Sequence, residues 1–112
     1  MNISYEGIGR LLVTFPDCGA GEGQVCKINS EGMADVCLTN DRFCGVAHMV
    51  DQGMASVQME GFVTVEYSGA APTLGYNKLA ADGFGGVYVN TSGQTYLVVK
   101  VDTSRTTVTF KL

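Results

Sequence analysis

Apolar and polar residues alternate along the stretch VQMEGFVTVEY at residues 57–67. Every second position holds an apolar residue or glycine, and polar residues take most of the positions between them. A period of two is typical of a β-strand with one buried face. Gly61 lies in the middle, where a bulge or sharp bend would let one long strand serve both halves of a closed sheet.

Further strands are predicted where β-branched and aromatic residues are enriched. TVTFKL at 107–112 repeats the alternation, and RLLVTF at 10–15 and TYLVVKV at 95–101 are rich in strand formers. Glycine-rich turn sequences separate these runs, and no stretch has the pattern of an amphipathic helix. We expect an all-β fold, a small single-domain β-barrel or β-sandwich that is built from hairpins and spans residues 1–112.

The sequence also contains a weak internal repeat. A shift of 51 residues aligns 27–61 with 78–112 without a gap, and six of the 35 aligned positions are identical. The shift matches Glu31-Gly32 to Asp82-Gly83, and Asp-Gly is a strong signal for a two-residue hairpin turn. The repeat indicates a duplicated hairpin-rich unit, although two β segments with alternating valines also match partly by chance.

The same turn predicts a pair of cysteines. If Glu31 and Gly32 are the two loop residues, counting outward places Cys26 opposite Cys37. Directly opposed strand residues have Cβ atoms about 4.5 to 5.5 Å apart, slightly farther than a disulfide prefers. We expect two reduced thiols packed side by side, and the alternative is a bridge that forms after release into an oxidising medium.

Cys44 lies four residues before His48, the only histidine. On a strand these residues would stand roughly 13 Å apart, too far for a nucleophile and its base or for two ligands of one zinc ion. We expect Cys44 to pack as a small apolar side chain and His48 to be a satisfied or surface residue. The cysteine spacing does not match zinc sites, and GxSxG, HExxH and P-loop motifs are missing. We predict no metal, no cofactor and no enzymatic activity.

Composition narrows the classes of partner. Eleven acidic residues outnumber seven basic ones, giving a net charge of -4, and the basic residues are scattered along the chain. Nucleic acid is therefore not an expected partner. No apolar run approaches 18 residues, and NISYEGIGR follows Met1 in place of a basic stretch and an apolar core. We expect neither a membrane span nor a signal peptide.

The order of these motifs resembles a family of small capsid decoration, or cement, proteins of tailed phages and prophages. The resemblance is carried by Gly23 with VCKI at 25–28, FCGVA at 43–47, Gly53 with SVQMEGFVTV at 56–65, LGYNKLAADG at 74–83 and the terminal TVTFKL. The chain departs from the family pattern in YLVVKV at 96–101 and in its four cysteines.

The resemblance implies a non-enzymatic virion protein that binds and stabilises the outer surface of the capsid shell. Its partner would be the major capsid protein, and the protein would form a homotrimer around a local symmetry axis. Three linked weak contacts would act together as one tight contact. Such a protein would be made in the bacterial cytoplasm and would be located on the virion.

Two apolar segments are candidates for contacts with the capsid or with other subunits. The loop YSGAAPTLGY at 67–76 contains Pro72 and Leu74, and residues 1–9 would form an arm that carries Ile3, Tyr5 and Ile8. The N-terminal segment would alternatively be an ordinary edge strand or a frayed terminus.

The main rival interpretation is a free-standing β-barrel binding module for a glycan or a cell-surface protein. Such a module would need a concave cluster of aromatic residues. The chain has no tryptophan, and its five phenylalanines and five tyrosines are spread along the sequence. The sequence pattern therefore favours the capsid interpretation over the binding module.

Overall fold

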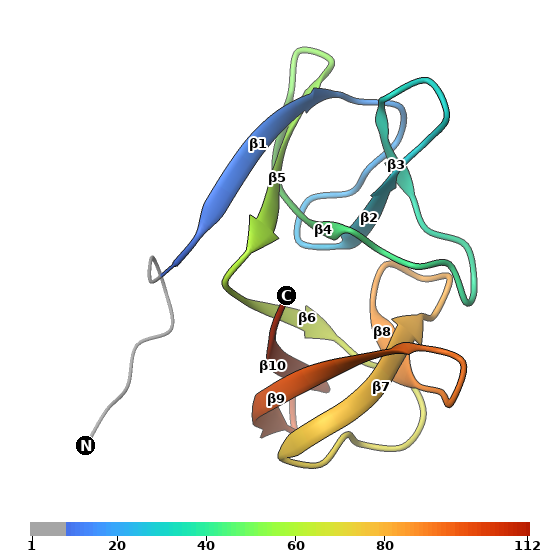
Figure 1. Ribbon diagram of the computed structural model, residues 1–112, viewed down its shortest axis with the longest axis vertical. Coiled ribbons are helices and arrows are strands. Elements are labelled where there is room, and N and C mark those ends of the chain that lie inside the picture. Colours follow the sequence, from blue (N-terminus) through green and yellow to red (C-terminus); the bar gives the residue numbers. More distant parts are fainter. Residues whose placement is uncertain (1–8) are drawn as a thin grey trace.

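The computed structural model describes residues 9–112, which form strands and loops without a helix (Figure 1). The first antiparallel sheet contains β1 (Leu11–Pro16), β2 (Val25–Ile28), β3 (Ala34–Val36), β4 (Gly45–Asp51) and β5 (Met54–Glu60). The second contains β6 (Phe62–Glu66), β7 (Gly75–Ala81), β8 (Val87–Val89), β9 (Gln94–Asp102) and β10 (Thr107–Lys111). The predicted all-β class is confirmed. Within residues 9–112 there is no helix that could cross a membrane.

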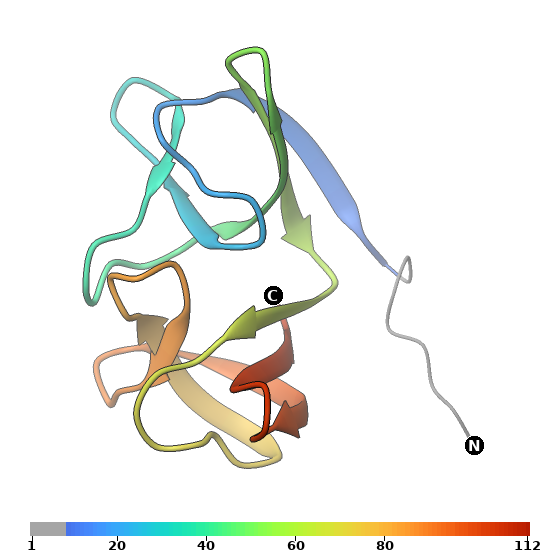
Figure 2. The same ribbon diagram turned by 180° about the vertical axis from the view of Figure 1, so that it is seen from behind.

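The two sheets repeat one strand order. The first runs β1-β5-β4-β2-β3 and the second β6-β10-β9-β7-β8, so each strand corresponds to the strand five places later. Each sheet curls until its two edges meet at one parallel bridge, between Asp17 and Ala34 in the first and between Tyr67 and Val87 in the second. Figures 1 and 2 show the two curled sheets stacked along the long axis. The topology therefore agrees with the repeat indicated by the sequence.

The gapless alignment is nevertheless wrong inside the repeated hairpin. The loops are residues 29–33 and 82–86, and each begins with a side chain that organises it. The Asn29 side-chain oxygen accepts two backbone N–H bonds of its own loop, at 2.9 and 3.0 Å. Asp82 accepts the equivalent pair at 2.7 and 3.1 Å. Asn29 therefore corresponds to Asp82, and the shift in this hairpin is 53 residues.

These loops overturn the predicted two-residue turns at Glu31-Gly32 and Asp82-Gly83. Each connection has five residues, because the capping side chain satisfies backbone N–H groups inside a longer loop. The longer loop changes the register by one residue, so Cys26 lies opposite Val36. The prediction that Cys26 faces Cys37 is wrong for this reason.

Gly61 lies at the corner where the chain passes from the first sheet into the second. Its φ of 98° is in the region that favours glycine, and an added Cβ would lie 3.2 Å from the Cα of Arg10. The buried Gln58 amide spans the corner and donates to the carbonyl oxygens of Glu60 and Phe62 at 2.9 and 3.0 Å. The predicted bend at Gly61 is confirmed.

Two apolar clusters fill the molecule. The larger one joins both sheets and contains Val25, Cys37, Phe43, Val46, Val63, Val65, Tyr67, Leu79, Ala81, Val87, Val98, Val108 and Phe110. The smaller one belongs to the first sheet and contains Ala20, Cys26, Ala34, Ala47, Ala55 and Val57. The shared cluster holds the halves together, since burial of its side chains in both sheets removes apolar surface from water.

Candidate functional site

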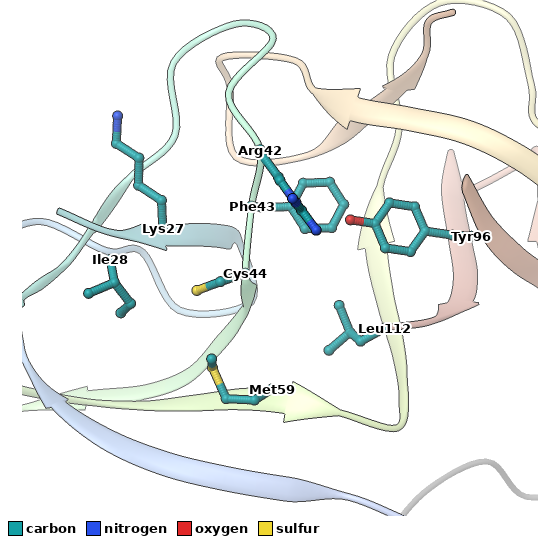
Figure 3. A pocket seen from close by; sticks show the side chains of 8 residues that line it. All are labelled: Lys27, Ile28, Arg42, Phe43, Cys44, Met59, Tyr96 and Leu112. Atoms are coloured by element: carbon teal, nitrogen blue, oxygen red, sulfur yellow. The ribbon is translucent and has the colours of Figure 1, made fainter. Parts of the chain in front are cut away.

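A cavity of about 470 Å³ lies where the two sheets meet (Figure 3). Both halves of the chain line it, through Lys27, Ile28, Arg42, Phe43, Cys44, Met59, Tyr96 and Leu112. Most of these side chains are apolar, and two carry positive charge. The volume is in the range of small-molecule sites in proteins. The cavity is therefore large enough to admit a small organic molecule.

Three aromatic rings pack together at this cavity. The rings of Phe43 and Tyr96 stack with centroids 5.1 Å apart, and Phe110 packs against both at 5.9 and 5.1 Å. Burial raises the pKa of Tyr96, and the nearby charge of Arg42 opposes this effect. The cluster was missed by sequence reasoning, because its members are far apart along the chain and only the contact between sheets brings them together.

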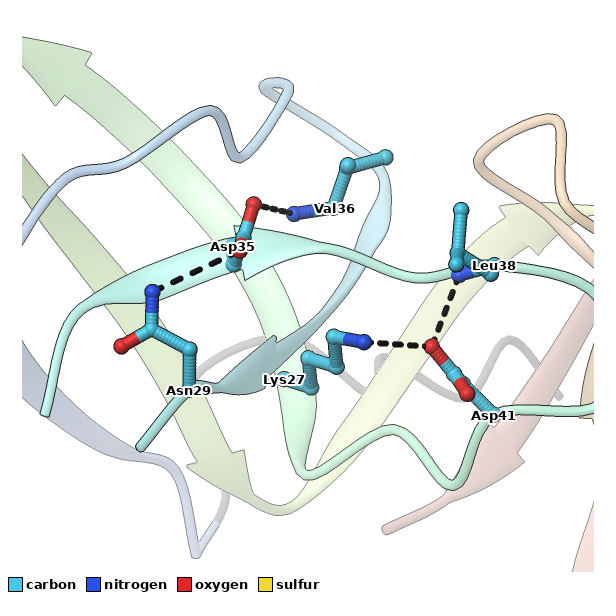
Figure 4. A network of polar contacts seen from close by, with 6 residues as sticks. All are labelled: Lys27, Asn29, Asp35, Val36, Leu38 and Asp41. Atoms are coloured by element: carbon cyan, nitrogen blue, oxygen red, sulfur yellow. Dashed lines mark hydrogen bonds and ion pairs between the residues drawn. The ribbon is translucent and has the colours of Figure 1, made fainter. Parts of the chain in front are cut away.

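The two cations at the cavity differ in their partners. The ammonium group of Lys27 donates to the Asp41 carboxylate at 2.6 Å, and the same oxygen accepts the Leu38 N–H at 2.9 Å (Figure 4). This bond raises the pKa of Lys27 and lowers that of Asp41. Arg42 is exposed and forms no ion pair with any residue from 9 to 112. Of the two cations, Arg42 is therefore the one without an ion-pair partner in the described part of the chain.

Two thiols meet at the same place. Cys44 precedes β4 and lines the cavity, while Cys26 on β2 is 0% exposed. The backbone N–H of Cys44 donates to the Cys26 carbonyl at 2.9 Å. The interaction between the two side chains favours the thiolate of Cys44 and lowers its pKa to about 7. The same interaction, together with burial, raises the pKa of Cys26 far above its ordinary range.

The other cysteines lie elsewhere, and all four are free thiols. Cys37 is 1% exposed and belongs to the cluster that joins the sheets, where burial raises its pKa to about 12. Cys18 is exposed. The thiol partner of Cys26 is thus Cys44 and not the predicted Cys37. Among residues 9–112, no three His, Cys, Asp or Glu side chains are arranged to hold a metal ion.

His48 and Cys44 have separate partners. His48 is exposed, and its Nε2 lies 2.5 Å from the Oε1 of Gln58. The register of β4 against β5 shifts between Ala47 and Met49, so His48 occupies an irregular position in the strand. The hydrogen bond to Gln58 agrees with the prediction that His48 is a satisfied residue, whereas Cys44 contacts Cys26.

The predicted contact residues have different positions. Ile3, Tyr5 and Ile8 lie outside the described residues. Pro72 is buried within the chain, so it does not present the contact surface that was predicted. Leu74 is 69% exposed at the end of the same loop. Of the two predicted contact residues that the structure describes, Leu74 is the one that is exposed to another molecule.

Further exposed apolar side chains were missed by sequence reasoning. Tyr76, two residues after Leu74, is 76% exposed, and Phe84 is 86% exposed at the tip of a hairpin. The alternation of apolar and polar residues shows which face of a strand is buried, but it does not show which loop residues are exposed. Exposed side chains next to glycines therefore have no distinctive sequence pattern. Tyr76 extends the apolar surface at the start of β7 that begins with Leu74.

No protein-family model matches this chain, and no curated protein or solved structure matches it either.

Proposed function

We propose that the protein is a non-enzymatic virion structural protein that binds and stabilises the outer surface of a tailed-phage capsid shell. The proposal starts from the resemblance in sequence to capsid decoration proteins. The observation that supports it is the exposure of Leu74 and Tyr76 at the predicted contact loop. Large apolar side chains gathered at one exposed place are typical of surfaces that bind another protein.

The energetics of this loop suit a multivalent contact. Burial of a large apolar side chain contributes about 1.5 to 3 kcal/mol, which is too little for stable binding by one subunit. A trimer would present three such loops, and linked contacts raise the overall affinity by orders of magnitude. The partner is the major capsid protein, arranged around a local symmetry axis of the shell.

The test is cosedimentation with expanded shells assembled from the major capsid protein of the same genome. We expect the wild-type protein to sediment with the shells, and the double variant Leu74→Ser/Tyr76→Ser to lose affinity about tenfold or more. Met49→Ser is the matched control, since Met49 is 61% exposed on another strand. Wild-type protein that stays in the supernatant would contradict the function, and a double variant that still sediments would contradict only the contact loop.

The second candidate is a free-standing binding module for a glycan or a cell-surface protein. The cavity with its aromatic cluster favours it, because sugar rings and apolar groups pack against aromatic faces. Binding of the isolated protein to a glycan panel, without affinity for shells, would support the module. Binding to shells without glycan affinity would support the capsid function.

A further inference from the structure

We propose that Cys44 and Cys26 form a dithiol site that small anionic disulfides oxidise through the cavity, with Cys44 as the attacking thiol and Cys26 as the resolving thiol. The inference is independent of the proposed capsid function, because it depends only on residues around the cavity. It assigns a chemical role to two cysteines that the sequence alone suggested were packing residues.

The order of attack follows from access. Cys44 lines the cavity and is half-buried, so a reagent that enters the cavity meets its sulfur directly (Figure 3). Cys26 is 0% exposed and is not among the residues that line the cavity, although its carbonyl oxygen accepts the Cys44 N–H at 2.9 Å. A reagent in the cavity therefore meets Cys44 and not Cys26. Thiolates are the reactive form of cysteine, and the interaction with the Cys26 side chain favours the thiolate of Cys44.

The charge at the cavity selects the class of reagent. Arg42 lines the cavity without an ion-pair partner among the described residues, and Lys27 adds a second cation beside Asp41. The lining otherwise consists largely of apolar and aromatic side chains. A small disulfide that combines an apolar body with carboxylate groups matches both features, since its charge meets Arg42 and its body displaces water from apolar surface.

The reaction balances as two successive thiol–disulfide exchanges. The Cys44 thiolate attacks one sulfur of the small disulfide, forms a mixed disulfide and releases the first thiolate. Cys26 then loses its proton to that leaving group or to water and attacks the sulfur of Cys44. The second thiolate leaves, and a Cys26–Cys44 bond remains. Two protein thiols are oxidised by two electrons, and one small disulfide is reduced to two thiols.

Proximity favours the second exchange over a long-lived adduct. The backbones of the two residues are joined by a hydrogen bond at 2.9 Å, and their side chains are close enough to shift each other's pKa. A sulfur–sulfur bond is about 2.05 Å long, so the sulfurs must approach each other while their strands remain paired. Cys37 does not compete, because its side chain packs in the other apolar cluster.

The test uses the Cys18→Ser variant, which removes the exposed cysteine. We add dithiobis-nitrobenzoate, an anionic aromatic disulfide, to the folded protein and follow released thiolate and intact mass. Two thiolates per chain, a mass lower by two hydrogens and a mapped Cys26–Cys44 bond are expected. A retained mixed disulfide, an unreactive protein, or a bond to Cys37 would overturn the proposal. This measurement needs no substitution in the core.

Variants separate the roles of the thiols. In the Cys18→Ser background, Cys26→Ala is expected to release one thiolate and keep the adduct, and Cys44→Ala is expected to lose the fast reaction. Cys37→Ala is the matched control and should behave like its parent. Circular dichroism checks the fold of each variant. Complete oxidation of the folded Cys26→Ala variant would contradict the resolving role.

The contribution of the Arg42 charge is tested by comparing the reaction rates of an anionic and an uncharged disulfide. Arg42→Gln should slow the reaction with the anionic disulfide severalfold and change little with dithiodipyridine, an uncharged aromatic disulfide. Arg105→Gln is the control, because Arg105 is exposed in the β9–β10 turn away from the cavity lining. An equal effect of Arg42→Gln on both reagents would overturn the preference for anions.

Discussion

Single side chains in this protein acquire their chemistry from neighbours that are distant in sequence. Cys37 and Cys44 have the same ordinary thiol chemistry, yet the pKa of Cys37 is raised to about 12 and that of Cys44 is lowered to about 7. Burial in the shared apolar cluster disfavours the charged form of Cys37. The interaction with the Cys26 side chain stabilises the charged form of Cys44 and lowers its pKa. The environment and not the residue type decides which thiol reacts.

The raised pKa of Cys37 predicts a loss of stability at alkaline pH. An unfolded cysteine thiol has an ordinary pKa of 9.0, while burial raises the pKa of the folded Cys37 to about 12. The stabilisation is thus complete below pH 9 and is lost as the pH rises above it. Because this thiol ionises in the unfolded chain and not in the folded one, we expect the unfolding free energy to fall by about 1 kcal/mol between pH 9 and 10.

Urea unfolding at pH 8, 9 and 10 measures this loss. Cys37→Ala should show a smaller decrease in unfolding free energy over this range than the wild-type protein, whatever its stability at neutral pH. Cys18→Ala is the control and should keep the wild-type slope, since Cys18 is exposed. Equal slopes in the wild-type protein and in Cys37→Ala would contradict the assignment of the loss to Cys37.

At the scale of the elements, one corner connects the two sheets. Gly61 adopts a φ of 98°, and the Gln58 amide binds the carbonyl oxygens on both sides of it. The sequence predicted the bend from one glycine inside an alternating pattern, because only glycine adopts such a φ at little cost. The two hydrogen bonds that the Gln58 side chain donates across this corner could not be predicted, since glutamine at a strand position ordinarily faces solvent.

Substitution of Gly61 by alanine tests the corner. The added Cβ would lie 3.2 Å from the Arg10 Cα, in addition to the cost of the φ. Gly53→Ala is the matched control, because Gly53 has a φ of 76° with nothing within 4 Å of the added Cβ. We expect Gly53→Ala to cost about 1 to 2 kcal/mol, and Gly61→Ala to cost more. Thermal or urea unfolding measures both, and a smaller cost at Gly61 would show that the corner is not constrained.

The hairpins show where element prediction fails. The turn signals at Glu31-Gly32 and Asp82-Gly83 predicted hairpins where β2–β3 and β7–β8 lie, but the register depends on loop length, which the capping oxygens of Asn29 and Asp82 set. An error of one residue in the loop moves every side chain to the other face. For that reason the predicted cysteine pair failed, while the strands themselves were placed correctly.

At the scale of the whole molecule, two curled sheets share one apolar cluster. The cavity lies at their junction, so neither half alone contains it. The exposed side chains of Leu74 and Tyr76 lie on the second half, at the start of β7. The arrangement places exposed apolar side chains on the second half and Cys44 at the junction of the sheets.

The capsid proposal predicts a homotrimer. Native mass spectrometry of the reduced wild-type protein should show three chains per particle, because closed rotational symmetry suits a protein that sits on a symmetry axis of a shell. Leu74→Ser/Tyr76→Ser should weaken the trimer if this surface also lies between subunits, and Met49→Ser should not. A monomer at every concentration, together with absent shell binding, would contradict the decoration function.

The sequence by itself determined the all-β class, the main strands and the corner at Gly61, because periodicity and glycine conformations are local properties. It indicated the repeat without establishing it. Tertiary structure decided the hairpin register, the aromatic cluster around Phe43, and the pairing of Cys26 with Cys44. These features join residues that are 6 to 67 positions apart, and they depend on loop length and on the packing of one sheet against the other. Local sequence patterns do not show which distant residues come into contact. The cavity and the position of Cys44 in it therefore depend on the packing of the two sheets.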